Sequence, residues 1–193
     1  MRRLLVISDH IQDPQILHDA ANPTTRTVEL CYETDDLASL YGKMADAAGG
    51  SAGTLRSVAF MDHGHPGSFN LLEGLTINLD ELHSNLELRD FFKSVGKLLL
   101  PDHQPELLRT MSVAAGARCM GRIDLLCCSV AKEDGKKTPL IVELEKISGF
   151  NVCASTDVLG NPEEGGNWVL ETDGIDSGCL LSTNSANLLQ VSM

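Results

Sequence analysis

This 193-residue sequence has few basic residues, few aromatic residues and no long apolar segment. Its 15 Lys and Arg residues are outnumbered by 27 Asp and Glu residues, which gives a formal net charge of -12. Because phosphate binding needs a positive surface, this balance argues against nucleic acid or an anionic membrane as a partner. No stretch approaches the roughly 18 consecutive apolar residues that a membrane-spanning helix requires. We therefore expect neither nucleic acid nor a membrane as a partner.

The sequence also lacks a C-x-x-C pair, although it contains six cysteines. Several of these cysteines lie inside apolar segments, and we interpret them as reduced thiols of a cytoplasmic protein rather than as a disulfide framework. The first apolar run ends at Ser8-Asp9-His10 and is too short for a signal peptide. No Gly-rich phosphate loop follows that run, so the sequence predicts no nucleotide and no other cofactor. The oligomeric state stays open.

Strand-like and helix-like segments alternate along the chain, which is typical of βαβ units. This pattern predicts an α/β fold, a three-layer α/β/α sandwich with a mainly parallel sheet. The length suits a single domain, which we assign to residues 1–178, followed by a C-terminal tail at 179–193. We expect two helices between 80 and 120, with breaks at Gly96 and near Pro101. The expected strands are 3–8, 25–32, 55–61, 123–128, 150–154 and 168–171, with a hairpin at 69–79 and further helices at 13–21, 35–48 and 138–149.

Two of the predicted strands end in residues that can carry chemistry. His63 and Gly64 follow the strand at 55–61, and Cys128 ends the strand at 123–128. Because parallel strands deliver their carboxyl ends to one edge of a sheet, we expect the imidazole and the thiol to lie close together. A Cys and a His placed in this way form a candidate nucleophile with its proton-transfer partner. The backbone N–H groups of Gly64 and Cys128 are candidates to stabilise an oxyanion.

Polar residues also follow other predicted strands. Asp9, Ser155 and Asp157 are candidates for substrate binding, and a carboxylate among them favours an Arg or Lys side chain by charge pairing. Each candidate also has a structural explanation. Cys128 can be a small buried apolar residue, His63 a hydrogen-bonded turn residue and Asp157 a turn cap.

Two further interpretations remain open. His63 and His65 have the His-x-His spacing that can supply two imidazoles to zinc in a metal-dependent hydrolase. Such a site needs more ligands, and the remaining histidines form no second clustered pair, so we predict no metal. A redox sensor built on Cys127, Cys128 and Cys153 lacks the spacing of a resolving cysteine. Cys127 and Cys128 are expected to point to opposite faces of their strand.

Five sequence blocks, in the same order and spacing, resemble an uncharacterised bacterial domain family found near the start of very large surface adhesins and calcium-repeat proteins. Together they extend from about Leu4 to Ile175, nearly the whole chain. The blocks are His63-Gly64-His65-Pro66-Gly67-Ser68-Phe69, Leu75-Thr76-Ile77-Asn78-Leu79-Asp80-Glu81-Leu82, Asp124-Leu125-Leu126-Cys127-Cys128-Ser129-Val130-Ala131, Ser148-Gly149-Phe150-Asn151-Val152-Cys153-Ala154-Ser155 and Gly165-Gly166-Asn167-Trp168-Val169-Leu170-Glu171.

That family in turn resembles the caspase–haemoglobinase fold of caspases, gingipains and clostripain, which carry a His-Gly after one strand and a catalytic Cys after the next. The resemblance implies that His63, Gly64 and Cys128 are the matching residues. Our leading hypothesis is a cysteine-peptidase-like protein that cleaves a peptide or protein substrate, or itself. The alternative is a non-catalytic binding or scaffold module of the same fold.

Overall fold

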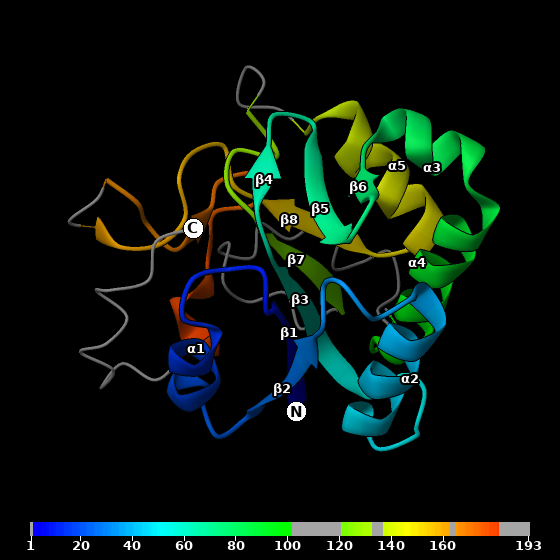
Figure 1. Cartoon of the computed structure of the whole chain (residues 1–193), viewed down its shortest axis with the longest axis horizontal. Helices are drawn as coiled ribbons and strands as arrows, with labels where there is room; N and C mark the ends of the chain where they lie inside the picture. The colour runs from blue at the N-terminus through cyan, green and yellow to red at the C-terminus, as the bar shows by residue number, and fades with distance from the viewer. Residues whose placement is uncertain (1, 102–120, 133–136, 163–164, 182–193) are drawn as a thin grey trace, which may run out of the picture.

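The structure is a computed structural model, and it describes residues 2–101, 121–132, 137–162 and 165–181. Within these ranges, five parallel strands form the central sheet (Figure 1). Their order is β2-β1-β3-β7-β8, so β3 lies between β1 and β7. The predicted α/β fold with a mainly parallel sheet is confirmed. The strands are β1 (Arg2–Ser8), β2 (Thr25–Leu30), β3 (Leu55–Met61), β7 (Arg122–Leu126) and β8 (Asn151–Ala154).

Two layers cover the faces of this sheet, which completes the three-layer arrangement (Figure 1). Because both faces are covered, the inner strands have nearly continuous apolar sequences, as is typical of parallel sheets. One layer contains α2 (Leu37–Ala48), α3 (Leu79–Ser84), α4 (Leu86–Leu98) and α5 (Pro139–Ser148). The other contains α1 (Pro14–Ala20), the antiparallel pair β9 (Val169–Leu170) and β10 (Ile175–Asp176), and a 3-10 turn at Ser177–Leu180.

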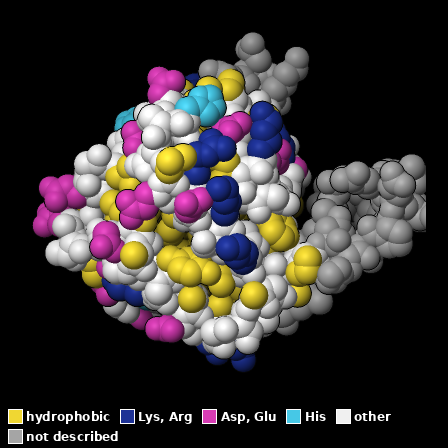
Figure 2. Space-filling model, turned by 90° about the vertical axis from the view of Figure 1, so that its right-hand side faces the viewer, with side chains coloured by type: hydrophobic (Ala, Val, Ile, Leu, Met, Phe, Trp, Pro, Cys, Tyr) yellow, Lys and Arg dark blue, Asp and Glu magenta, His cyan; other side chains and the backbone are white. Residues whose placement is uncertain are grey.

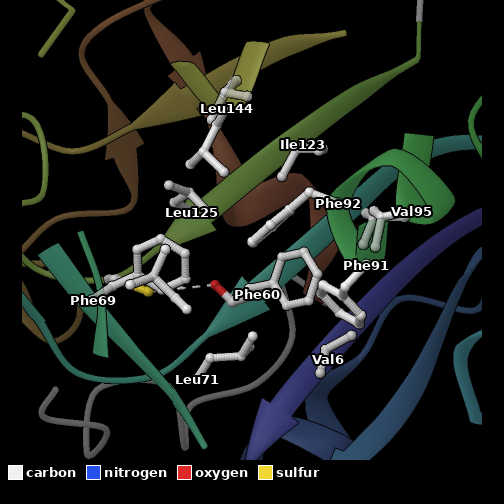
Figure 3. Close-up of a cluster of buried hydrophobic side chains, with 14 of the residues drawn as sticks. Val6, Phe60, Phe69, Leu71, Phe91, Phe92, Val95, Ile123, Leu125 and Leu144 are labelled. Carbon is white, nitrogen blue, oxygen red and sulfur yellow. Dashed lines mark hydrogen bonds between the residues drawn. The ribbon is translucent and has the colours of Figure 1, made fainter. Parts of the chain in front are cut away.

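The larger core lies between the sheet and the four-helix layer. Phe60 of β3 meets Phe91 and Phe92 of α4, with ring centroids 6.3 and 6.1 Å away (Figure 3). Phe91 and Phe92 themselves meet edge to face at 5.2 Å. Such aromatic pairs add about 0.5–1.5 kcal/mol to the gain from burying their apolar area. These rings therefore attach α4 to the middle of the sheet.

The outer surface of the helical layer carries charges of both signs. Figure 2 shows acidic and basic side chains there, interspersed with apolar ones. On α4, Lys93 lies 2.8 Å from Asp90, and Arg89 reaches Glu143 of α5 at 3.3 Å. The exposed Lys93–Asp90 pair contributes little to stability. None of the described helices is both long enough and apolar enough to span a membrane.

A small antiparallel sheet follows β3 directly. Its strands are β4 (Gly64–His65), β5 (Ser68–Leu72) and β6 (Leu75–Ile77), in the order β4-β5-β6. The predicted hairpin is present, and Gly74 adopts the positive φ of 72° that its turn requires. The predicted second strand ends at Ile77 because the Asn78 side chain accepts a hydrogen bond from the Glu81 N–H and begins α3.

The predicted break at Gly96 is wrong, since α4 continues through this residue. The interruption instead lies at Asn85, whose side chain caps α4 by accepting a hydrogen bond from the Leu88 N–H. A Cβ atom at position 96 would lie 2.3 Å from the carbonyl oxygen of Ser148, at the end of α5. Gly96 therefore permits close packing of α4 against α5. The break predicted near Pro101 extends into residues outside the described ranges.

The start of the predicted C-terminal tail packs into the domain. Leu180 and Leu181 are buried in the smaller core, beside α1. The Asn22 N–H donates to the Leu180 carbonyl at 2.9 Å, and Leu181 forms an isolated bridge with Ala21. The last predicted strand is reduced to β9, which pairs with β10 rather than with the central sheet. The remainder of the predicted tail, 182–193, lies outside the described residues.

Phe92→Ala is expected to lower the free energy of unfolding by about 3–5 kcal/mol, because it leaves a cavity between α4 and the sheet. Leu86→Ala, in the same helix but with Leu86 74% exposed, is the matched control and should change stability by less than about 0.5 kcal/mol. Denaturant unfolding measures both. A Phe92→Ala protein as stable as the control would contradict the central position of this ring.

Candidate active site at the carboxyl edge of the sheet

The carboxyl ends of β1, β3 and β7 bring three polar segments to one edge of the sheet. β3 pairs with β1 on one side and with β7 on the other, through Ile7↔Met61 and Met61↔Leu126. The residues that follow β3 therefore lie between those that follow β1 and those that follow β7. This is the edge at which open α/β sheets hold their ligands.

His63 and Cys128 follow a directly paired position of β3 and β7. Met61 pairs with Leu126, and both pack into the smaller core. His63 and Cys128 stand two residues further along, and Cys128 packs against the same core. Both side chains are half-buried. The thiol and the imidazole thus come from neighbouring segments, as the predicted strand ends require.

The backbone at Gly64 passes close to the segment that follows β7. A Cβ atom at Gly64 would lie 2.5 Å from the Cys128 carbonyl oxygen and 2.8 Å from the Cys127 Cβ. Two neighbouring hydrogen bonds hold the hairpin against the same segments. The Gly67 N–H donates to the Val130 carbonyl at 3.1 Å, and the Asn70 N–H donates to the His63 carbonyl at 3.0 Å. The absence of a side chain at position 64 therefore allows the chain after β3 to pass close to the Cys127–Cys128 backbone.

The adjacent cysteines have opposite environments. Cys127 is buried in the larger core, where its thiol donates to the Phe60 carbonyl at 3.7 Å (Figure 3). Burial, with the Asp62 carboxylate as a second cause, raises the pKa of the Cys127 thiol well above its usual value. Cys128 lies on the other face, and its Sγ accepts from the Leu159 N–H at 3.4 Å. The predicted opposition of the two side chains is confirmed.

Cys153 is buried on the same face of the sheet as Cys128. Burial raises the pKa of its thiol, and the Asp124 carboxylate raises it further. The three thiols that the redox interpretation combined are therefore divided between two cores. Among the four cysteines whose side chains the structure describes, Cys31 and Cys128 are the two that are not fully buried.

The three candidate substrate-binding residues all make contacts within the protein. The Asp9 carboxylate accepts from the Tyr32 N–H at 2.8 Å. The buried Ser155 hydroxyl lies 3.1 Å from the Asp157 carboxylate, and this exposed carboxylate accepts from Asn167 at 3.1 Å. Their roles in substrate binding stay predictions.

Glu171 is a residue that the sequence did not single out at this edge. Its carboxylate accepts from the Ser155 hydroxyl at 3.0 Å and from the Thr156 N–H at 2.7 Å. Glu171, which comes from the C-terminal region, therefore fixes the segment that follows β8. Only the folded arrangement places Glu171 there.

A second group of titratable side chains lies at the same edge, and the sequence analysis did not recognise these three residues as one cluster. His10, Asp62 and His63 each offer a ligand atom, and all three atoms lie within 4.8 Å of one another. The His10 Nδ1 is 3.7 Å from the Asp62 Oδ1, and the His10 and His63 rings meet edge to face at 5.1 Å. The other face of His10 stacks on Tyr32 at 4.2 Å.

Asp62 is the buried member of this group, with 2% of its surface exposed. Burial raises the pKa of its carboxyl group, while the His63 N–H, which donates to it at 2.6 Å, acts in the opposite direction. His65 is exposed on β4 and is not a member of the group. The partner of His63 is therefore His10, which the sequence analysis set aside because it has no neighbouring histidine in the chain.

These features define an α/β protein whose candidate site combines a half-buried thiol with a cluster of two imidazoles and a carboxylate. The chain belongs to the family described as Domain of unknown function (DUF4347), whose model matches residues 4–188. A search of curated proteins and a search of solved structures gave no match.

Gly64→Ala is expected to lower the free energy of unfolding by about 1–3 kcal/mol, because the added methyl group overlaps the Cys127–Cys128 backbone. Gly42→Ala is the control. Gly42 is exposed in α2 with no atom within 4 Å of an added Cβ, so alanine there should stabilise the helix by about 0.5–1 kcal/mol. Denaturant unfolding compares the two, and equal stabilities would contradict the close approach at Gly64.

Proposed function

We propose that this protein is a cysteine-peptidase-like hydrolase in which Cys128 is the nucleophile and His63 is its proton-transfer partner. The observation that carries the proposal is the placement of the two residues. Each follows the paired Met61 and Leu126 by two positions, and the backbone at Gly64 lies close to that of Cys127 and Cys128. Nucleophilic catalysis needs a thiol and an acid–base group within reach of one substrate atom. The substrate class is a peptide or protein.

The reaction follows from the chemistry of these groups. The Cys128 thiolate attacks the peptide carbonyl carbon, and the resulting oxyanion accepts hydrogen bonds from the N–H groups of Gly64 and Cys128. Such donors each contribute about 3 kcal/mol where they have been measured. His63 then protonates the leaving amine, and the C–N bond breaks to leave a thioester. Water attacks the thioester while His63 accepts its proton, and the C–S bond then breaks to release the acid. This restores the Cys128 thiolate and the protonated His63, the pair formed at the start when the thiol passes its proton to His63.

The acidic residues near the edge suggest which substrates are preferred. Asp157 is exposed, and its carboxylate retains hydrogen-bonding capacity beyond its contacts with Ser155 and Asn167. We propose that Asp157, with Asp9, favours Arg or Lys before the scissile bond, because a carboxylate pairs strongly with a guanidinium or ammonium group. The free thiols among the described cysteines support a reducing compartment such as the cytoplasm.

One contact favours the alternative, a non-catalytic binding module of the same fold. The Cys128 Sγ lies against the backbone of the buried Leu159, 3.4 Å from its nitrogen and 3.9 Å from its oxygen. In a module of this kind, the thiol would serve to hold the segment after β8 rather than to react. Thiol reactivity distinguishes the two functions.

With metal-free protein at neutral pH, iodoacetamide is expected to label Cys128 faster than Cys31. His63→Ala should slow the labelling of Cys128 by about tenfold or more, since a positioned acid–base group contributes roughly 10²–10⁴ to a reaction. Cys127 and Cys153 should stay unlabelled in the folded protein, because burial raises the pKa of both thiols and excludes the reagent. Mass spectrometry of timed samples measures each site.

The matched control is His65→Ala, which removes an exposed imidazole two residues from His63 and should leave the labelling rate unchanged. If Cys128 reacts no faster than Cys31, or if His63→Ala has no effect, the proposed nucleophile is contradicted.

A set of unstructured peptides tests the hydrolytic step. The wild-type protein is expected to cut peptides with Arg or Lys before the scissile bond faster than peptides with Glu there, by charge pairing. Cys128→Ala should abolish cleavage, while its circular dichroism spectrum stays unchanged. Chromatography with mass detection identifies the products. Rapid labelling of Cys128 without cleavage of any peptide in the set would favour the binding module.

A further inference from the structure

The cluster of His10, Asp62 and His63 has a geometry that the proposed peptidase reaction does not use. His10 follows β1, while Asp62 and His63 follow the neighbouring strand β3. Their three ligand atoms lie within 4.8 Å of one another, and the His10 Nδ1 and Asp62 Oδ1 are 3.7 Å apart. Three potential ligands from two adjacent strand ends therefore converge on one point.

Asp62 supplies an independent indication of a missing ligand. Its Oδ1 accepts from the His63 N–H at 2.6 Å, whereas its Oδ2 is buried with no partner at hydrogen-bond distance among the described residues. The Ser8 hydroxyl also interacts with this carboxyl group and acts to lower its pKa. An unpartnered buried carboxylate oxygen is costly, since it has lost its hydration without gaining a replacement. A cation bound beside Asp62 would compensate this oxygen.

We propose that His10, Asp62 and His63 form a binding site for a zinc ion. Zinc bonds of about 2.0–2.2 Å in tetrahedral geometry place ligand atoms about 3.4 Å apart, so small side-chain movements suffice to close the site from its present separations. Three protein ligands leave a fourth position for water, as in zinc sites that stay open.

The ligand set selects zinc over the abundant hard cations. Two imidazoles and one carboxylate suit zinc, whereas Ca²⁺ takes six to eight oxygen ligands and Mg²⁺ retains several waters. The His10 side chain is 44% exposed and the Asp62 side chain 3%, so the metal can enter from the His10 side.

Neighbouring residues hold His10 in position. Its ring stacks on Tyr32 with an angle of 18° between the planes. The Tyr32 backbone is fixed in turn, because its N–H donates to Asp9 at 2.8 Å and its carbonyl accepts from the Glu73 N–H at 2.9 Å. Support of this kind around metal ligands strengthens binding, since it reduces the ordering that the metal must impose.

Zinc at this position would also control the thiol. His63 cannot bind zinc through its ring and at the same time exchange protons with Cys128. Bound zinc therefore competes with the proton transfer and suppresses the reactivity of Cys128. This consequence rests on the proposed function, whereas zinc binding itself does not.

EDTA-treated protein is titrated with zinc in a calorimeter, and we expect one bound ion per chain. Excess Mg²⁺ should not displace the bound zinc. Wild-type protein and Cys128→Ala should bind alike, because the thiol is not a ligand. His10→Gln, Asp62→Asn and His63→Gln should each weaken binding by about tenfold or more, the loss that even supporting residues of a metal site produce. Asp62→Asn keeps an acceptor for the His63 N–H.

His65→Gln is the matched control, because His65 is an exposed histidine beside the site and should bind zinc with unchanged affinity. NMR of the wild-type protein adds a readout that needs no variant, with the ring signals of His10 and His63 shifting on zinc addition and that of His65 staying in place. The proposal is overturned if no zinc binds, if His10→Gln binds as tightly as wild type, or if His65→Gln loses binding.

Labelling of Cys128 with and without zinc separates the two proposals. Zinc should slow iodoacetamide labelling of Cys128 in the wild type but not in His10→Gln. If zinc binds through these residues while the labelling rate stays constant, the metal site stands and the role of His63 beside Cys128 fails. If no zinc binds but Cys128 still reacts rapidly through His63, the metal site fails and the proposed nucleophile stands.

Discussion

The close approach of the Gly64 backbone to the Cys127–Cys128 segment is the contact on which the arrangement of this edge depends. Three parallel strands end here side by side, and the chain that leaves β3 must pass directly over the chain that leaves β7. A Cβ atom at Gly64 would lie 2.5 Å from the Cys128 carbonyl oxygen, too close for the backbone to stay in place. Close by, the hairpin that follows β3 is held to the segment after β7 by the hydrogen bond from the Gly67 N–H to the Val130 carbonyl.

At the same edge, two adjacent cysteines have different environments although their side chains are chemically identical. Cys127 points into the larger core and Cys128 into the edge of the smaller one. Burial makes the Cys127 thiol harder to ionise by raising its pKa, whereas Cys128 stays half-buried. Both residues lie just beyond β7, where the chain turns, and their side chains pack against different cores. Within one Cys-Cys dipeptide, one thiol is therefore buried in a core and the other is half-buried at the edge of the sheet.

Much of the fold could be predicted from local pattern, and the errors have definite causes. The apolar segments of β1, β3 and β7 and the turn at Gly74 were evident because burial and backbone conformation restrict residue choice locally. Gly96 was misjudged as a helix break because its role is to admit the Ser148 carbonyl oxygen from another helix. A glycine kept for tertiary packing cannot be distinguished in sequence from a glycine that ends a helix.

The sequence by itself determined that a parallel sheet forms and that polar residues follow its strands, because the period of apolar residues reflects burial. It thereby identified His63, Gly64 and Cys128 as candidates. Only the tertiary structure decided which strand ends are neighbours, since strand order depends on how the layers pack. The order β2-β1-β3-β7-β8 places His10 beside Asp62 and His63. Residues 52 positions apart in the chain, His10 and Asp62, thereby become parts of one site.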